Sequence, residues 1–385
     1  MTTTRILIVA GERSGDLYGA GLARALAARL DGVEFFGCGG EALREAGADT
    51  VVNAHEIALA GITEVVRGLP RVYRAYRRLL REVDLRKPQL AILIDFPDFN
   101  LRLAGKLKQR GIPIVYFVSP QVWAWRRGRI KTLKARVTKM LVIFDFEEAI
   151  YKQAGVQVEF VGHPLADRAE LQFERAPFFE KLGLDPSLPT VALLPGSRPQ
   201  EVRKHLPVML DAAQRMASRR ALQFVVAIAP GLSPGEVEPI LRGANAGIEN
   251  LRPAWYCTQN VLAHSDVGVV ASGTATLEAA LRERPMVVGY RVSGLTWLVG
   301  KLMVRVPFYS IVNILAGKRL VPELMQNDFN ALNVAAQVEY LLDHSEAREE
   351  MVQGFRGLRA RLGPGGAFDR AAAAVVGVLE PTRQP

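Results

Sequence analysis

The chain has 385 residues, of which 49% are apolar and 23% charged, and these proportions exclude disordered, collagen-like and coiled-coil chains. It contains only two cysteines, Cys38 and Cys257, which are too isolated for a disulfide framework or a zinc module, so a reducing compartment is favoured. The formal net charge of +10 favours an anionic partner and leaves nucleic acid, a phospholipid surface and a phosphorylated substrate open.

Apolar runs stay below the roughly 18 residues that a membrane-spanning helix needs. The start of the chain, Met1 to Arg5 followed by Ile6 to Ala10, is too short for a signal peptide. We therefore expect a cytoplasmic protein. At roughly 150 residues per domain, two domains are the starting expectation.

Short β-branched or aromatic runs alternate with helix-like stretches, a pattern typical of βαβ units. In the first half the predicted strands are Ile6–Ala10, Val33–Gly37, Leu90–Phe96, Ile114–Val118, Met140–Phe144 and Glu159–Val161. In the second half they are Thr190–Leu194, Phe224–Ile228, Val267–Ala271 and Met286–Tyr290. The fold class is therefore α/β, with two doubly wound domains and a cleft between them.

The stretch from Ala166 to Pro189 is rich in charge and proline and is the predicted junction between the domains. We place the first domain at residues 1–168 and the second at 169–385. An Ala-rich helix is expected at Arg370–Val378, and the final helices are candidates to pack back on the first domain.

Ligands of open parallel sheets bind outside the carboxyl ends of the strands, so the polar residues after each apolar run are the first candidates for a site. The first such turn is Gly-Glu-Arg-Ser-Gly-Asp at 11 to 16. It lacks the order G-x-G-x-x-G, and its two acids disfavour a dinucleotide pyrophosphate. Asp16 also suits a plain turn that is stabilised by the helix dipole, whereas Glu12 falls at the strand tip.

The second turn, Asp-Phe-Pro-Asp-Phe-Asn at 95 to 100, follows the most apolar strand. Asp95 and Asp98 lie three residues apart with phenylalanines between and after them. This pattern suits a general base in a partly dry pocket. A helix-capping role for Asp98 is the alternative.

Two turns in the second half have the chemistry of a phosphate site. Gly196 and Ser197 offer backbone N–H and hydroxyl donors, and Arg198 offers a bidentate guanidinium ahead of a predicted helix at Glu201–Met209. An ordinary strand-to-helix turn is the alternative.

The other turn runs from Ser272 through Gly273 and Thr274 to Glu278. Its small residues leave a helix N-terminus open to a diphosphate, and Glu278 is placed to accept hydrogen bonds from ribose hydroxyls. The two turns together predict a nucleotide-sugar diphosphate site rather than a P-loop, since no G-x-x-x-x-G-K-[ST] occurs in the chain.

Seven motifs in chain order resemble the lipid-A-disaccharide synthase family. They are Ala-Gly-Glu-Arg-Ser-Gly-Asp (10 to 16), Ile-Asp-Phe-Pro-Asp-Phe-Asn (94 to 100), Val-Ser-Pro-Gln-Val-Trp-Ala-Trp-Arg (118 to 126), Gly-His-Pro (162 to 164), Leu-Leu-Pro-Gly-Ser-Arg (193 to 198), Ala-Ser-Gly-Thr-Ala-Thr-Leu-Glu (271 to 278) and Met-Val-Val-Gly-Tyr-Arg (286 to 291). The resemblance continues through Asn-Ile-Leu-Ala-Gly (313 to 317). Arg13, where the family often has a small residue, departs from its pattern, as does the missing proline before Phe146.

This resemblance implies a GT-B glycosyltransferase that joins UDP-2,3-diacylglucosamine to 2,3-diacylglucosamine 1-phosphate, giving a β-1,6 disaccharide 1-phosphate and UDP. It also implies that Asn313 lies on the donor side and that Ser14 and Asp16 face the acceptor. No cofactor is expected. The absence of a D-x-D triplet is consistent with a reaction that needs no metal.

The implied reaction inverts the anomeric centre in a single displacement. Asp98 is the predicted base, with Glu12 and Asp95 orienting the acceptor or tuning Asp98, while Glu12 and Asp16 stay open as alternative bases. Arg198 and the helix that starts near Ser272 would stabilise the leaving diphosphate.

Acylated substrates imply contact with a bilayer, on the cytoplasmic face of the inner membrane of a Gram-negative bacterium. The segment 69–83 has an apolar stripe at helical spacing (Leu69, Val72, Tyr73, Tyr76, Leu79, Leu80, Val83) and an arginine stripe on another face (Arg71, Arg74, Arg78, Arg81). Such a helix suits a peripheral contact with anionic lipid, and equally a core-packed helix with a solvated face. Trp123 and Trp125 beside Arg126 are predicted to line the acyl-chain path.

Three other functions use some of the same features. Nucleic-acid binding would use the arginines, but RRM and zinc-finger patterns are missing, so no nucleic acid is expected. A UDP-sugar epimerase would share the architecture but has no use for an arginine-rich helix, and a lipid-binding module would need no acid at Asp98. The oligomeric state stays open, a homodimer included.

Overall fold

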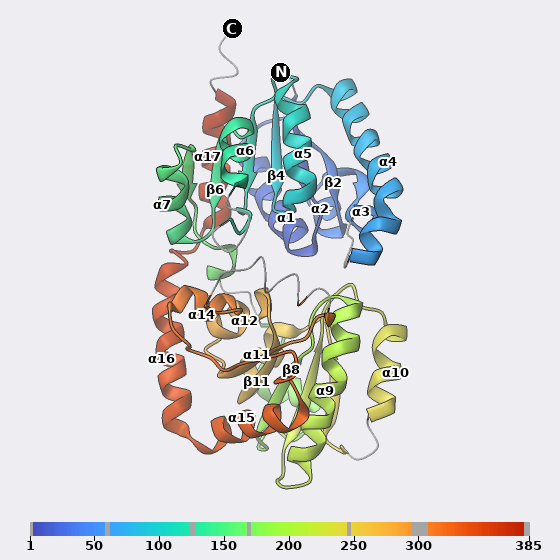
Figure 1. Cartoon of the computed structure of the whole chain (residues 1–385), viewed down its shortest axis with the longest axis vertical. Helices are drawn as coiled ribbons and strands as arrows, with labels where there is room; N and C mark the ends of the chain where they lie inside the picture. The colour runs from blue at the N-terminus through green and yellow to red at the C-terminus, as the bar shows by residue number, and fades with distance from the viewer. Residues whose placement is uncertain are drawn as a thin grey trace. The chain divides into compact units, whose positions relative to one another are not determined.

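The computed structural model describes residues 3–57, 62–122, 128–167, 171–244, 248–294, 297 and 307–380. These residues fall into two compact units (Figure 1). The first unit holds those up to Asp167 together with those from Arg361 onward, and the second holds those between. Each unit is built around a parallel sheet, which confirms the predicted α/β class of two doubly wound domains.

The sheet of the first unit has the order β3-β2-β1-β4-β5-β6-β7. Its strands are β1 (Thr4–Ala10), β2 (Val33–Gly39), β3 (Asp49–Asn53), β4 (Leu90–Ile94), β5 (Ile114–Phe117), β6 (Lys139–Val142) and β7 (Val158–Phe160). All of β4 is buried, because helices cover both faces of the sheet, and its sequence is therefore continuously apolar. The winding reverses between β1 and β4, so the carboxyl ends of these two strands form the switch point where ligands bind in such sheets.

The first unit is completed by a helix from the distant C-terminal part of the chain. Its helices are α1 (Arg13–Ala27), α2 (Glu41–Glu45), α3 (Ala54–Ile57), α4 (Ile62–Arg86), α5 (Pro97–Lys108), α6 (Arg129–Arg136), α7 (Asp145–Gln153), the 3₁₀ turn η1 (Pro164–Ala166) and α17 (Ala367–Leu379). Helix α17 packs beside α1 (Figure 1). The Phe368 ring fills the space next to Gly21, where a Cβ would lie 2.4 Å from a ring carbon, and Arg29 donates to Asp369 at 3.3 Å.

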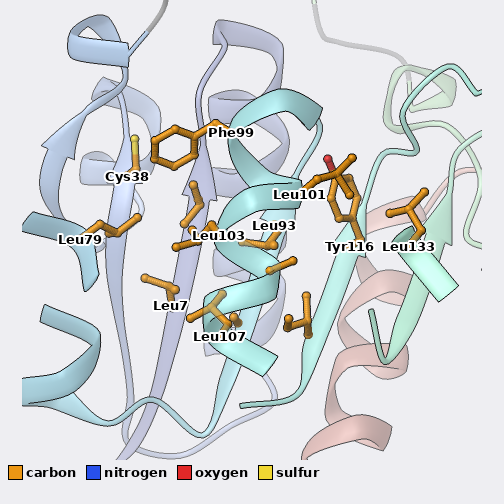
Figure 2. Packing of buried hydrophobic residues seen from close by; sticks show 14 of the residues in the cluster. Leu7, Cys38, Leu79, Leu93, Phe99, Leu101, Leu103, Leu107, Tyr116 and Leu133 are labelled. Atoms are coloured by element: carbon orange, nitrogen blue, oxygen red, sulfur yellow. The ribbon is translucent and has the colours of Figure 1, made fainter. Parts of the chain in front are cut away.

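The core of the first unit fixes the position of α5. Figure 2 shows Leu103 and Leu107 of α5 packed toward Leu7 and Leu93 of the central strands, and all four side chains are fully buried. Burying each leucine stabilises the fold by about 1.5–3 kcal/mol. Because Asp98 lies in the first turn of α5, this packing also holds the segment that carries the predicted base.

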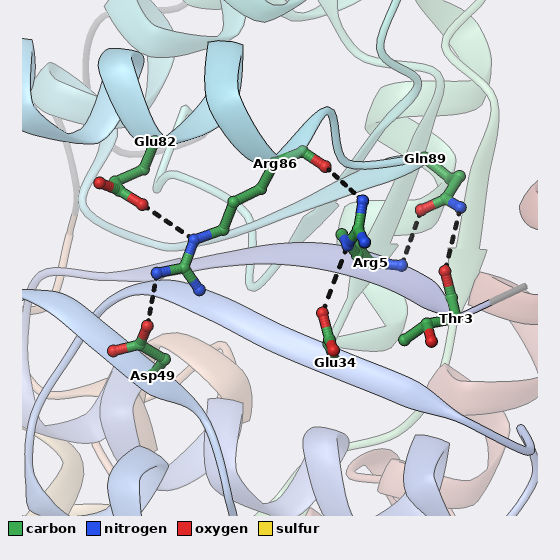
Figure 3. A network of polar contacts seen from close by, with 7 residues as sticks. All are labelled: Thr3, Arg5, Glu34, Asp49, Glu82, Arg86 and Gln89. Atoms are coloured by element: carbon green, nitrogen blue, oxygen red, sulfur yellow. Dashed lines mark hydrogen bonds and ion pairs between the residues drawn. The ribbon is translucent and has the colours of Figure 1, made fainter.

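A polar network anchors the C-terminal end of α4 to the sheet (Figure 3). Arg86 donates to Glu82 at 2.8 Å and to Asp49 at 2.6 Å. Arg5 donates to Glu34 and to the Arg86 carbonyl oxygen, both at 3.3 Å. These strand residues lie at the amino-terminal ends of β1, β2 and β3. The network is therefore structural and lies at the edge of the sheet away from the switch point.

The sheet of the second unit has the order β10-β9-β8-β11-β12-β13. Its strands are β8 (Thr190–Leu194), β9 (Gln223–Ile228), β10 (Leu251–Trp255), β11 (Val267–Ala271), β12 (Met286–Tyr290) and β13 (Glu323–Met325). Its helices are α8 (Arg175–Leu182), α9 (Pro199–Ala217), α10 (Pro234–Ala244), α11 (Thr258–His264), α12 (Thr274–Leu281), α14 (Ile311–Ala316), α15 (Ala331–Asp343) and α16 (Ser345–Arg361). The switch point here lies between β8 and β11.

Some predicted boundaries are wrong. The strands expected at Leu90–Phe96 and Ile114–Val118 end earlier, because Asp95, Phe96 and Val118 have φ angles of 45°, 47° and 64°, which a strand does not accommodate. Strands β3, β10 and β13 were not predicted. The stretch from Ala166 to Pro189, predicted as a junction, contains α8 of the second unit.

Candidate functional site

The carboxyl ends of β1, β4 and β5 bring the polar turns of the first unit together. Ala10 of β1 pairs with Ile94 of β4, which in turn pairs with Phe117 of β5. The turns that follow these strands are therefore neighbours. Gly11 lies against the Phe96 ring, and a Cβ there would lie 2.3 Å from a ring carbon, so the first turn requires glycine.

The turn between β4 and α5 is strained and held by its neighbours. Asp95 and Phe96 both have left-handed backbone, which costs about 1–3 kcal/mol for each such residue. The Tyr116 hydroxyl donates to the Asp95 carbonyl oxygen at 2.5 Å, and Asn100 Nδ2 donates to the same oxygen at 2.9 Å and to the Ile94 carbonyl at 3.1 Å. These bonds fix the direction in which α5 leaves the sheet.

Asp98 is the carboxylate of this edge with the clearest access to solvent. Its side chain is 70% exposed, and the largely buried guanidinium of Arg129 in α6 donates to its Oδ1. Glu12 and Ser14 are half-buried at the start of α1. An exposed carboxylate that an arginine orients at the switch point suits the removal of a proton from a bound hydroxyl.

Asp16 has a structural role instead. Its carboxylate accepts hydrogen bonds from the backbone N–H groups of Gly40, Ala42 and Leu43 at 2.6, 3.0 and 3.3 Å. The residue is buried, and these bonds hold the start of α2. Asp16 is therefore a weaker candidate base than Asp98 or Glu12, since its carboxylate is already bonded to three backbone N–H groups.

In the second unit, the turn after β8 is organised by a carboxylate of its own chain. Glu201 Oε2 accepts from the backbone N–H groups of Ser197 at 3.1 Å and Arg198 at 3.3 Å. The sequence predicts the backbone N–H groups of Gly196 and Ser197 as phosphate donors, and the structure has that of Ser197 bonded to Glu201. The Ser197 hydroxyl and the half-exposed Arg198 guanidinium, which lies 3.6 Å from Glu201, stay candidate phosphate donors of this turn together with the Gly196 N–H.

The turn between β11 and α12 keeps the features expected of it. Gly273 and Thr274 are exposed at the start of α12, and the Ser272 hydroxyl donates to a backbone carbonyl at 3.2 Å. Gln259 of α11 donates to Glu278 Oε2 at 2.7 Å. This bond orients the carboxylate that the sequence predicts as a ribose acceptor.

Asn313 is committed to the fold. The residue is fully buried, and its Nδ2 donates to the Val321 carbonyl and to Glu323 Oε1, each at 2.9 Å. Its Oδ1 accepts from the N–H groups of Leu320 at 2.7 Å and Val321 at 2.9 Å. Two donated and two accepted bonds use the full capacity of the amide. None of its hydrogen-bonding groups remains for a donor sugar, contrary to the role that the resemblance implies.

Comparison with known proteins decides the family. A sequence profile described as lipid-A-disaccharide synthetase matches residues 6–364. A lipid-A-disaccharide synthase from Myxococcus xanthus (strain DK1622) is 45% identical over 383 residues, covering 98% of each chain. One from Geobacter sulfurreducens (strain ATCC 51573 / DSM 12127 / PCA) is 43% identical over 380 residues, also covering 98% of each. This chain belongs to the lipid-A-disaccharide synthase family. It is a glycosyltransferase of lipid A biosynthesis.

Solved structures place this synthase family member in a broad fold class. A putative UDP-N-acetylglucosamine 2-epimerase from Listeria monocytogenes matches with a TM-score of 0.69 and 15% identity, covering 100% of this chain and 99% of its own. CalG4, the calicheamicin glycosyltransferase, matches with a TM-score of 0.61 and 17% identity, covering 100% of each chain. At such identities the likeness shows the fold alone, and the predicted GT-B architecture is confirmed.

In this family member, the predicted apolar stripe of α4 divides into a buried and an exposed part. Leu79 is fully buried in the core, and Val72 and Tyr76 pack against that core. Leu69 and Tyr73, by contrast, are 51% and 62% exposed. Most of the stripe therefore has the core-packing role, and only its N-terminal part presents apolar side chains to the outside.

The other residues predicted to face lipid are only partly described. Arg78 donates to Glu56 at 2.6 Å, so this arginine is paired within the protein. Trp123, Trp125 and Arg126 lie outside the described residues. Within the described ranges, no helix of this synthase family member is long and apolar enough to cross a bilayer.

Two residues that organise the site were not predicted. Glu201 follows Arg198 by three residues, the spacing of a capping box, so its bond to the start of α9 had a local signal. Gln259 had none, because its hydrogen-bond partner Glu278 lies 19 residues away in the chain and only the fold brings the two side chains together.

Proposed function

We propose that this glycosyltransferase condenses UDP-2,3-diacylglucosamine with 2,3-diacylglucosamine 1-phosphate to form a β-1,6-linked disaccharide 1-phosphate and UDP. The observation that carries the reaction type is the exposed Asp98 carboxylate, oriented by Arg129 at the switch point of the first unit. Family membership supports the substrate class.

The reaction in this proposal is a single in-line displacement. The acceptor 6-hydroxyl oxygen attacks the anomeric carbon of the donor as Asp98 takes its proton. The bond from that carbon to the UDP oxygen breaks, and the anomeric configuration inverts. Glu12 and Asp95 hold the acceptor side in this scheme. A positioned base of this kind contributes about 10² to 10⁴ in rate.

The second unit would hold the nucleotide in this scheme. Arg198 and the Ser197 hydroxyl meet the diphosphate, whose negative charge grows as UDP leaves. The exposed start of α12 at Gly273 and Thr274 adds the positive end of a helix dipole. Glu278, held by Gln259, accepts hydrogen bonds from the ribose hydroxyls.

The direct test supplies both acylated sugars in detergent and follows the products by mass spectrometry. A disaccharide monophosphate together with free UDP is expected. In a parallel reaction with UDP-N-acetylglucosamine as the sole substrate, turnover would instead indicate an epimerase. Binding of either acylated sugar without reaction would indicate a lipid-binding module.

Replacing Arg198 with alanine should weaken UDP binding about 10- to 100-fold, because a charge-assisted contact to phosphate is worth roughly 1.5–3 kcal/mol. Isothermal titration calorimetry with UDP measures this change. Arg203→Ala is the matched control, since Arg203 is an exposed arginine of the same helix beyond its first turn. Equal affinity in the wild type and Arg198→Ala would remove the turn after β8 from the nucleotide site.

We also propose that the protein binds the cytoplasmic face of the inner membrane through the N-terminal part of α4. Leu69 and Tyr73 are exposed apolar side chains on a helix whose Arg74 and Arg81 are also exposed. Apolar side chains beside cationic ones suit the boundary between anionic headgroups and acyl chains.

A pair of leucine variants separates membrane contact from folding. Leu69→Ser should lower binding to vesicles that contain anionic phospholipid at least threefold, with the free energy of unfolding changed by no more than about 0.5 kcal/mol. Leu79→Ala should instead cost about 2–5 kcal/mol of stability, because it leaves a cavity in the core. Vesicle sedimentation and denaturant unfolding measure the two effects. Unchanged sedimentation of Leu69→Ser would exclude this face of α4 as the lipid contact.

A further inference from the structure

A buried histidine in α9 joins two of the loops at the carboxyl edge of the second sheet. His205 lies seven residues, about two helical turns, after Arg198 and is fully buried. Its Nδ1 is 2.9 Å from the Pro195 carbonyl oxygen, and its Nε2 accepts from the Arg291 backbone N–H at 3.0 Å. Pro195 opens the turn after β8, and Arg291 follows β12 directly.

Both ring nitrogens lie close to backbone groups of Pro195 and Arg291. With the proton on Nδ1, the ring donates to the Pro195 carbonyl oxygen and accepts from the Arg291 N–H, so that both segments are bonded at once. Nε2 also lies 3.2 Å from the Arg291 carbonyl oxygen, to which it would donate in the other tautomer. Burial lowers the pKa of His205 below its usual range, which keeps the ring neutral near pH 7. The imidazole packs between Tyr290 and Phe329, with ring centroids 5.1 and 5.7 Å away, so its orientation is fixed.

The loops that His205 joins are not neighbours in the sheet. Strand β11 lies between β8 and β12, so the turn from Ser272 to Thr274 lies between the two bonded segments. A ligand at the turn from Ser272 to Thr274 would lie between the turn after β8 and the backbone after β12. The separation of these two segments therefore limits the room for that ligand. The buried His205 ring sets the separation, because it contacts both segments.

The Arg291 side of this link is itself braced. The Arg291 guanidinium donates to the carbonyl oxygens of Phe329 at 2.9 Å and Gln326 at 3.3 Å, and the Val292 N–H donates to Gln326 Oε1 at 3.0 Å. The backbone after β12 is thus tied to the backbone after β13. Through His205, the turn that carries Arg198 is therefore held at a fixed distance from the braced backbone at Arg291.

We infer that His205 is a positioning residue for the diphosphate of a bound nucleotide. It holds the turn from Pro195 to Arg198 at the separation from Arg291 that lets the Arg198 guanidinium and the start of α12 contact the same diphosphate. This inference rests on the proposed binding of UDP by the second unit. His205 touches no ligand and acts through the backbone of the turn.

The test uses UDP as the probe and three variants of the full chain. His205→Phe keeps an aromatic ring and loses both hydrogen bonds, and it should weaken UDP binding about tenfold. His205→Asn places an amide N–H near the position of Nδ1 and should restore the bond to Pro195, with affinity recovered to within about threefold of the wild type. His205→Gln reaches the Arg291 side instead and should not recover affinity. Calorimetry measures the binding.

A matched control separates positioning from general damage to the core. His264, at the C-terminal end of α11, is also buried, donates one bond from Nε2 to the Phe173 carbonyl oxygen at 2.9 Å and packs on Phe178. His264→Phe should lower the thermal midpoint by an amount similar to His205→Phe while leaving UDP affinity unchanged.

Each outcome has a definite meaning. Wild-type affinity in folded His205→Phe, with Arg198→Ala impaired, overturns the positioning role and leaves the nucleotide site standing. Wild-type affinity in both variants overturns the nucleotide site itself. If His205→Phe, His205→Asn and His264→Phe lose UDP affinity equally, the loss follows from general destabilisation of the core. This result also overturns the inference.

Discussion

Replacing Asp98 with asparagine should lower turnover of the two acylated sugars about 10²- to 10⁴-fold and leave UDP affinity nearly unchanged. The amide keeps the size of the side chain and its place in the first turn of α5, but it has no basic oxygen to take the acceptor proton. Initial rates of UDP release, measured at saturating donor and acceptor, give turnover, and calorimetry gives UDP affinity.

Asp84→Asn is the matched control for this substitution. Asp84 is also an arginine-paired carboxylate of the first unit, bonded to Arg110 at 2.7 and 2.9 Å, but it lies on α4. It should retain wild-type turnover. If Asp98→Asn also turns over normally, Asp98 is not the base, and Glu12 becomes the carboxylate to replace next.

Asn313→Ala should destabilise the fold by about 3 kcal/mol or more. It removes four hydrogen bonds at a buried position, and each buried group left without a partner costs about 1–3 kcal/mol, with partial relaxation expected. Equilibrium unfolding in denaturant measures the loss. Asn330→Ala is the control, because Asn330 caps α15 by accepting from the Asn333 N–H and donates one exposed bond to the Asn327 carbonyl oxygen, and caps are worth about 0.5–2 kcal/mol.

A second substitution separates the accepted bonds of Asn313 from the donated ones. Asn313→Asp keeps the two accepted bonds from Leu320 and Val321, loses both donated bonds and places a carboxylate beside Glu323. Unchanged stability together with a loss of UDP-sugar binding in either variant would return Asn313 to the donor side.

The predictability of the strands follows their position in the sheets. Central strands such as β4 and β8 are covered on both faces, so their sequences are unbroken apolar runs that can be recognised locally. The three strands that were not predicted, β3, β10 and β13, are all edge strands in the described sheets. Pro253 inside β10 and the brevity of β13 are features that edge strands tolerate and that conceal them in the sequence.

The positions of the candidate turns could be predicted, because each turn directly follows an apolar run that is recognisable in the sequence. The turns at Glu12, Asp98, Arg198 and Ser272 all follow central strands, and the structure has each of them at a carboxyl edge. The roles of single polar side chains were less predictable. Asp16 and Asn313 both occur in motifs that resemble a site. Asp16, however, binds backbone N–H groups at the start of α2, and Asn313 binds backbone groups of the segment before β13. The residues next to each in the sequence give no sign of these distant partners.

The position of α17 affects the order in which the two halves can fold during synthesis. A ribosome makes all of the second unit before it makes α17, so the face of α1 around Gly21, and Arg29 just after the helix, stay without their cover while the second half of the chain is still being translated. The half that begins first is thus the half that is finished last. Until Phe368 reaches Gly21, the nascent chain exposes an apolar surface to chaperones and to other unfinished chains.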